Sequence, residues 1–200
     1  METSNYHGRN SVLSYLVGAF NAMLVDLGLS DTWTVVSANQ PTLQGLQNNT
    51  IYIDIISKRR YGTQGTKSIK TNNGWYESSV WFEEMLVQVG GFLQRNPQTD
   101  DVDTLTSSDV VGLLQGCVNS NNDMGGVGTG QNKYGVKKRS YFVENWMQVI
   151  KSTELRELDY ETDSGLKEKL PQFDFVLVVE QNILKKADEI SNIEIGTERI

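Results

Sequence analysis

Cysteine and histidine are almost missing from this 200-residue sequence, which contains one of each. A single cysteine, Cys117, excludes an internal disulfide and any metal site built on several cysteines, and it favours an intracellular protein. The single histidine, His7, lies in a polar N-terminal decapeptide, where a disordered or partner-docked residue is more expected than a catalytic base. Nucleophilic catalysis assisted by histidine is therefore disfavoured.

Long apolar runs and a surplus of basic residues are also lacking. No stretch is apolar enough to span a bilayer, and the N-terminal residues lack the pattern of a secretory signal, so no membrane association is expected. The 18 basic and 25 acidic residues give a net charge of −7, which argues against tight, sequence-independent binding of nucleic acid. Basic clusters at residues 58–60 and 137–139, with an acidic segment at 154–163, suit complementary contacts between subunits.

The first third of the chain predicts one helix and two strands. Apolar residues recur at helical spacing over residues 11–27, and Gly28 follows where a left-handed residue would end the helix. Residues 33–36 predict a short strand. A second strand is expected around residues 51–56, because three isoleucines alternate with other residues, at Ile51, Ile53 and Ile55.

Residues 75–95 fit either a helix or a long strand that carries a bulge. We favour the strand, because β-branched and aromatic residues dominate and Gly90 and Gly91 would weaken a helix. A polar turn is expected before it, over residues 62–74.

The second half of the chain predicts a helix that begins near residue 106, with Thr106, Ser107 or Ser108 as its cap. Its apolar face includes Val110, Leu113, Leu114, Val118 and Cys117, so the cysteine is expected to be a small buried hydrophobe. Residues 136–151 are expected to enter a strand, and residues 173–183 alternate as a strand. Between these, residues 152–172 are charged and are expected to be exposed.

Helix, strands, helix and strands predict an α+β domain with a mostly antiparallel sheet, two flanking helices, long loops and extended termini. We expect a flexible N-terminal arm at residues 1–10 and one domain at residues 11–184. Residues 185–200, which include the segment ADEISNIEIGTERI, form an arm or a short edge strand.

A glycine-rich stretch, NNDMGGVGTGQNKYG at residues 121–135, comes close to a phosphate-binding loop. Gly125 and Gly130 have the required spacing, but Gln131 and Asn132 occupy the positions of the lysine and of the hydroxyl residue that binds magnesium. The stretch also follows a helix rather than a strand. A surface loop is the better interpretation.

Metal and nuclease motifs are incomplete as well. The chain contains no [DE]-x-K pair, and adjacent Glu83 and Glu84 would point to opposite faces of a strand. The acidic cluster at residues 100–103 lacks the glycine and the glutamate of a calcium loop. No cofactor, metal or catalytic residue is therefore predicted, although a small metal-dependent nucleic-acid enzyme using Asp54 or Glu83 remains an alternative.

The elements expected along the chain include an N-terminal helix, a strand that ends in RRYG at residues 59–62, the aromatic strand ESSVWFEEMLVQV and a helix over residues 109–118. A strand opened by KKRSYF and a closing FDFVLVVE strand follow. This order of features resembles the tail terminator (neck terminator) proteins of long-tailed bacteriophages.

The resemblance implies a structural virion protein, not an enzyme, that assembles in the host cytoplasm. It would cap the tail tube, as a sixfold ring of identical subunits, and contact the tail tube protein and the head-tail connector protein, while DNA passes through the lumen without specific binding. Candidate residues for the subunit or partner interface are Arg59, Arg60, Lys137, Lys138 and Arg139. Another connector or tail tube subunit, and a binding module for a host protein, are the structural alternatives.

Overall fold

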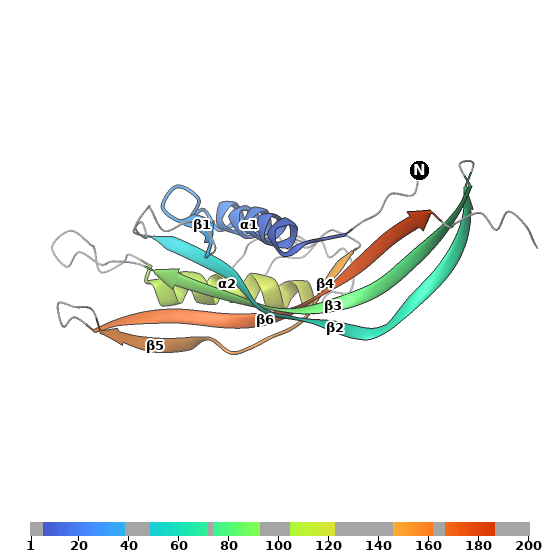
Figure 1. Ribbon diagram of the computed structural model, residues 1–200. Helices are drawn as coiled ribbons and strands as arrows, with labels where there is room; N and C mark the ends of the chain where they lie inside the picture. Colours follow the sequence, from blue (N-terminus) through green and yellow to red (C-terminus); the bar gives the residue numbers. More distant parts are fainter. Residues whose placement is uncertain are drawn as a thin grey trace, which may run out of the picture.

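Two helices lie against one face of a long, twisted sheet (Figure 1). The computed structural model describes residues 6–38, 49–71, 74–92, 105–122, 146–161 and 167–186. Within these residues the sheet has six strands in the order β1-β2-β3-β6-β4, with β5 also paired to β6. Only β1 and β2 run parallel. The predicted α+β class, with two helices and a mostly antiparallel sheet, is confirmed.

The elements occur along the chain in the order helix, three strands, helix, three strands. Their bounds are α1 Arg9–Asp26, β1 Thr34–Ser37, β2 Thr50–Thr71, β3 Gly74–Phe92, α2 Ser107–Asn122, β4 Met147–Ser152, β5 Arg156–Glu161 and β6 Lys167–Lys186. Neither helix is long and apolar enough to cross a membrane, among the residues that the structure describes.

The core lies between the helices and the face of the sheet that they cover. Helix α1 buries one face, which includes Leu16, Phe20 and Leu24. The helix ends before Gly28, as predicted, and the φ of Gly28 is +71°. Alternate residues of β2 and β6 point into the same core, which confirms the two strands that were predicted from their alternation. These residues are Ile51, Ile53, Ile55, Phe173, Phe175, Leu177 and Val179.

Helix α2 begins with a reciprocal cap. The Asp109 backbone N–H donates to the Thr106 hydroxyl oxygen at 3.2 Å, and the Thr106 N–H donates to the Asp109 carboxylate at 2.8 Å. The helix buries Cys117, as expected, although Val111 is fully buried in place of Leu113. Val111 approaches the sheet at Gly91, where an added Cβ would lie 2.6 Å from the Val111 Cγ2 atom. The glycine therefore permits a close contact between helix and sheet.

The strand interpretation of residues 75–95 is confirmed, but the expected bulge lies in the neighbouring strand. In β3, Trp81, Glu83 and Met85 continue one unbroken alternation, and the pairing of β3 with β6 has no register shift. The irregularities are in β2, between Ile55 and Ser57 and between Tyr61 and Gly65. Extra residues in β2 let it follow the longer path of a curved sheet.

Two expected connections are strands instead. Residues 62–71, predicted as a polar turn, continue β2 and pair with β3 as far as Thr71 and Gly74. Residues 62–70 of β2 are exposed on both faces, apart from half-buried Ile69, so they have no apolar alternation that would identify the strand. In the charged stretch 152–172, β5 and the first residues of β6 form an antiparallel pair, which corrects the prediction of a plain exposed connection. The expected strand opening at residues 136–146 lies almost wholly outside the described residues, and β4 begins at Met147.

Candidate assembly surface

The sheet extends beyond both helices as a three-stranded ribbon that curves at its end (Figure 1). We call this ribbon the arm: residues 56–71 of β2, residues 74–84 of β3 and residues 180–186 of β6. The ladder of β3 and β6 runs without interruption from the core to Tyr76 and Lys186, so the arm is a continuation of the core sheet. Continuous backbone pairing holds it in a defined direction.

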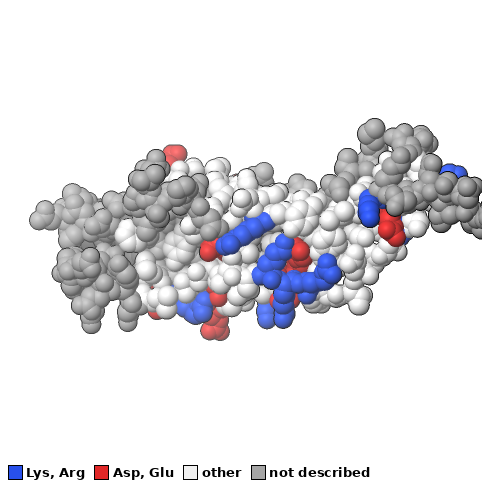
Figure 2. All heavy atoms as spheres, in the orientation of Figure 1, with Lys and Arg blue, Asp and Glu red and all other residues white. Residues whose placement is uncertain are grey.

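Basic side chains gather where the arm leaves the core, close to carboxylates of β3 (Figure 2). Lys58 and Arg60 lie on the face of β2 that continues the helix-covered face, opposite Met85 and Glu83, and Arg59 lies on the other face, opposite Glu84. The basic cluster thus divides between the two faces of the sheet because successive side chains of a strand alternate.

Glu83 is the centre of a buried polar cluster at the base of the arm. Its carboxylate lies 2.6 Å from Lys58 Nζ and accepts hydrogen bonds from Trp81 Nε1 at 3.3 Å and from Gln181 Nε2 at 2.7 Å. Gln181 is fully buried. The cluster joins β2, β3 and β6, so it fixes all three strands where the helices no longer cover them.

The surroundings of Glu83 stabilise its ionised form. Desolvation raises the pKa of Glu83, but hydrogen bonds from Lys58, Trp81 and Gln181 outweigh it and hold the pKa below its usual 4.5. For Lys58, desolvation lowers the pKa, and the hydrogen bond and charge of Glu83 reverse that effect and leave the pKa raised. Both groups are charged at neutral pH, as a structural ion pair requires.

The opposite face of the arm carries an exposed ion pair beside apolar side chains. Arg59 Nη2 lies 2.8 Å from the Glu84 carboxylate. The neighbouring cross-strand pair on this face is Tyr61 and Phe82, which are 50% and 40% exposed. Glu83 and Glu84 therefore point to opposite faces, as predicted, and each has its own cation.

Arg60, one of the predicted interface residues, has an aromatic partner. Its guanidinium carbon lies 5.3 Å from the ring centroid of Trp81, within the range of a cation–π contact. Towards the end of the arm, Lys70 Nζ lies 5.6 Å from the ring of Trp75, which is 51% exposed. The arm thus presents cations supported on aromatic rings.

Residues before α1 are docked onto the base of the arm. The His7 N–H donates to Gln181 Oε1 at 2.7 Å, Gln181 Nε2 donates to the His7 carbonyl at 2.9 Å, and the His7 ring stacks on Trp146 at 3.7 Å. His7 is therefore ordered against its own chain, which corrects the expectation of a disordered or partner-docked residue.

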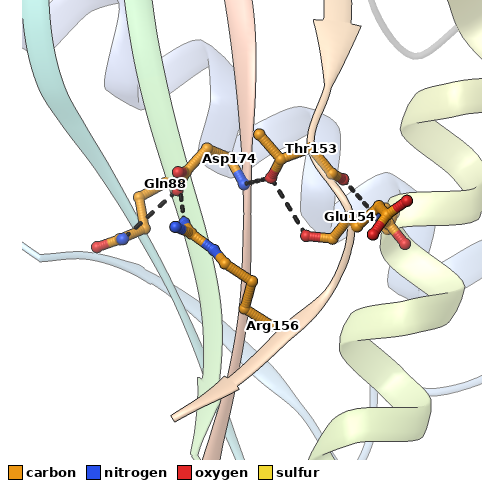
Figure 3. A network of polar contacts seen from close by, with 6 residues as sticks. Gln88, Thr153, Glu154, Arg156 and Asp174 are labelled. Atoms are coloured by element: carbon orange, nitrogen blue, oxygen red, sulfur yellow. Dashed lines mark hydrogen bonds and ion pairs between the residues drawn. The ribbon is translucent and has the colours of Figure 1, made fainter.

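A second polar cluster anchors the far edge of the sheet, as Figure 3 shows. The Asp174 carboxylate pairs with Arg156 Nη2 at 2.5 Å and accepts a hydrogen bond from Gln88 Nε2 at 3.4 Å. Thr153 and Asp174 exchange two further hydrogen bonds, of 2.7 and 2.9 Å. Burial, and then the charge of Asp174, raise the pKa of nearby Tyr52. These contacts connect β4 and β5 to β6.

The remaining sequence-predicted residues divide into those that the structure describes and those that it does not. Lys137, Lys138, Arg139 and most of the glycine-rich stretch lie outside the described residues. Asp54, named for the enzyme alternative, pairs with Arg9 at 2.6 Å. No group of three or more His, Cys, Asp or Glu side chains in the described ranges could hold a metal ion. Asp54, Glu83, Glu84 and Asp174 each form an ion pair with a basic side chain.

Gln181 and Arg9 are structurally important residues that the sequence does not reveal. Gln181 occupies a position where the alternation of β6 predicts an apolar residue, and its partners are distant in sequence. Arg9 also donates to the Ile55 carbonyl at 2.8 Å, 46 residues away. A polar residue in an apolar alternation was the only available signal for Gln181.

Part of the chain matches the model of a known protein family. Residues 11–126, more than half of the chain, match the family model described as E217 gateway protein gp29. The match begins within α1 and includes β1, the whole of β2 and β3, and α2. No curated protein matches the chain.

Proposed function

Because this chain belongs to the family of the E217 gateway protein gp29, a family of phage head-tail gateway proteins, we propose that it closes the tail tube as a ring and joins it to the head connector. Head-tail joining by a structural virion protein is the general role of the family. The ring, its sixfold symmetry and its position as tail terminator are our proposal.

The observation that carries this proposal is the family match over residues 11–126, which includes the β2 and β3 strands of the arm. A ring of identical subunits needs two different, complementary surfaces on each subunit. The arm projects beyond the helices, and it differs in charge and shape from the helix-covered body. It can therefore contact the body or arm of a neighbouring subunit.

The internal ion pairs of the arm fit a mechanical role. Lys58 and Glu83, and Arg59 and Glu84, connect β2 to β3 on opposite faces of the same ribbon. Cross-strand pairs of opposite charge stabilise a two-strand ladder that has little apolar surface to bury. A projection stiffened in this way keeps its direction, which a closed ring requires.

We infer that DNA passes through the lumen of this ring without being held. The net charge of −7 makes the subunit repel a polyanion wherever its carboxylates face the channel. Tail tube protein and connector protein would be the partners at the two ends of the ring.

Charge reversal of Lys137, Lys138 and Arg139 together tests the interface residues that lie outside the described ranges. We expect the triple change to glutamate to reduce ring formation or the joining of tails to heads, because reversed charges repel a complementary acidic surface. Lys151→Glu, at an exposed position of β4, is the control for a non-specific effect of charge. Normal rings and normal tail joining in the triple variant would remove these residues from the interface.

The position in the virion is tested by imaging particles that carry a labelled copy of the protein. A single labelled ring at the neck supports the proposal. Label repeated along the tail would instead identify a tube subunit, and label at the connector alone would identify another connector protein.

A further inference from the structure

Among the described residues, the outer edge of β2 has no strand partner along the arm, and we call it the open edge. Strand β1 pairs with β2 over Thr50 to Ile53 only, and the next outward carbonyl, that of Ile55, accepts a hydrogen bond from Arg9. From residue 56 to residue 71, no other strand among the described residues pairs with this edge. An unpaired edge of this length is a template for a further strand.

The open edge is basic. Residues 56–71 contain Lys58, Arg59, Arg60, Lys67 and Lys70 and no acidic residue. In the described part of the chain, Lys58 and Arg59 have ion pairs with β3, whereas Arg60, Lys67 and Lys70 have none. Within the described residues, the edge therefore carries more positive charge than its ion pairs balance, in a chain of net charge −7.

The two faces beside this edge differ. On one face the nearest cross-strand pair is Tyr61 and Phe82, which are both substantially exposed. On the other face lie Lys58, Arg60 and Lys70, whereas Arg59 and Lys67 share the face of Tyr61 and Phe82, so three of the five basic side chains gather on the face without this aromatic pair. A strand added here would fit best if its apolar side chains pointed to one face and its acidic side chains to the other.

Residues 187–200 have the composition that this edge requires. They carry four acidic residues against one arginine, with no proline, and Ile193, Glu194 and Ile195 alternate in polarity. Fourteen residues in extended form reach about 46 Å, and the sixteen residues of the open edge extend over roughly 53 Å. Length, charge and alternation all match.

We propose that residues 187–200 of one subunit add as a strand to the open edge of β2, residues 56–71, in the neighbouring subunit. This inference rests on the proposed ring, and it identifies the two complementary surfaces that such a ring needs. The donor is the segment that follows β6, and the acceptor is the arm. Backbone hydrogen bonds supply affinity, and the basic edge selects an acidic strand.

The topology favours a neighbouring subunit as the donor. Strand β3 lies between β6 and β2, and β6 ends at Lys186 near the end of the arm, opposite Tyr76. To reach its own β2 edge, the chain would have to reverse direction and cross two strands. Addition to a neighbour needs no reversal, and it uses a different surface on each of the two subunits, which is the kind of contact that a ring requires.

Cross-linking between two full-length variants tests this contact. One variant carries Ser68→Cys on the open edge, the other carries Ser191→Cys, and the native Cys117 is buried. A bismaleimide linker bridges the two thiols without demanding one register. We expect covalent heterodimers from the mixture, and we expect none when Lys151→Cys, on the opposite side of the sheet, replaces Ser68→Cys.

Charge exchange provides a second readout. Lys67→Glu/Lys70→Glu should weaken association about tenfold, equivalent to ~1.4 kcal/mol, and Glu194→Lys/Glu198→Lys should do the same. A chain with all four changes should recover most of the loss. The substituted side chains on the arm, those of Lys67, Ser68 and Lys70, are exposed, so circular dichroism should confirm an unchanged fold in these variants.

The outcomes separate this inference from the proposed function. Normal rings without the cross-link, and without an effect of the charge exchange, would overturn strand addition and leave the ring intact. The cross-link without closed rings would support strand addition and contradict ring closure. Absence of rings, cross-link and charge effect together would contradict both.

Discussion

Replacement of Glu83 by alanine tests the buried cluster at the base of the arm. The change removes the acceptor for Gln181 Nε2, which is fully buried but keeps the His7 carbonyl as a second acceptor, so this loss should cost about 1 kcal/mol. The loss of the Trp81 hydrogen bond should add about 0.5–1.5 kcal/mol. Lys58 is partly exposed and can be hydrated, so its contribution is about 0–1 kcal/mol.

Together these contributions predict that Glu83→Ala lowers the free energy of unfolding by about 1.5–3.5 kcal/mol. The adjacent variant Glu84→Ala is the matched control, because its carboxylate has one partner, the exposed Arg59. Urea denaturation monitored by tryptophan fluorescence would give both values. Equal effects of the two variants would refute the reasoning, because it assigns the difference to the partners of Glu83.

The pH dependence of stability should distinguish Glu83 as well. Its pKa in the folded state lies below the usual 4.5, so its ionised form contributes stability that is fully present above pH 4.5 and is lost as pH falls through the folded-state pKa. The difference in unfolding free energy between the native protein and Glu83→Gln should therefore shrink below pH 4.5. A difference that stays constant from pH 7 to pH 3 would show that the charge of Glu83 has no such role.

Two further predictions concern helix α2, one its contact with the sheet and the other its N-terminal cap. Gly91→Ala should destabilise the fold by about 1–3 kcal/mol, because the new Cβ would lie 2.6 Å from Val111 Cγ2. A melting temperature equal to or above that of the native protein would contradict this. Thr106→Ala should lower the free energy of unfolding by about 1 kcal/mol, because it removes the helix cap, and Thr106→Ser should retain most of this stability. Equal urea midpoints for the two variants would exclude a role for the hydroxyl.

The core elements could be predicted from the sequence because each has an apolar face. Ile51, Ile53 and Ile55 alternate in β2, and Phe173 and Phe175 do so in β6, and all five lie in the core. Helix α1 was likewise evident from its helical spacing and from Gly28. Where one face of an element is buried, its period is visible in the sequence.

The arm could not be predicted, because neither face of its β2 strand is buried. Residues 62–71 contain two glycines and two lysines, residue types that are depleted in strands, and their strand form depends on pairing with β3. The bulges were placed in the wrong strand for a related reason. The alternation of β3 is regular only if Glu83 counts as a core-facing residue.

Arg59 and Arg60 are the predicted interface residues that lie among the described residues, and their role in an interface stays a prediction. Arg59 and Arg60 were identified because three basic residues end an apolar strand, and the structure places them at the base of the arm. Their roles differ, since Arg59 pairs with Glu84 and Arg60 lies over Trp81. Such partners are set by cross-strand register, which local sequence does not specify.

Electron microscopy of the purified full-length protein, alone and mixed with isolated tail tubes over a wide concentration range, tests the central claim most directly. The account predicts closed rings at high concentration and rings seated at the ends of tubes. Monomers that persist throughout the range and leave tube ends bare would contradict it.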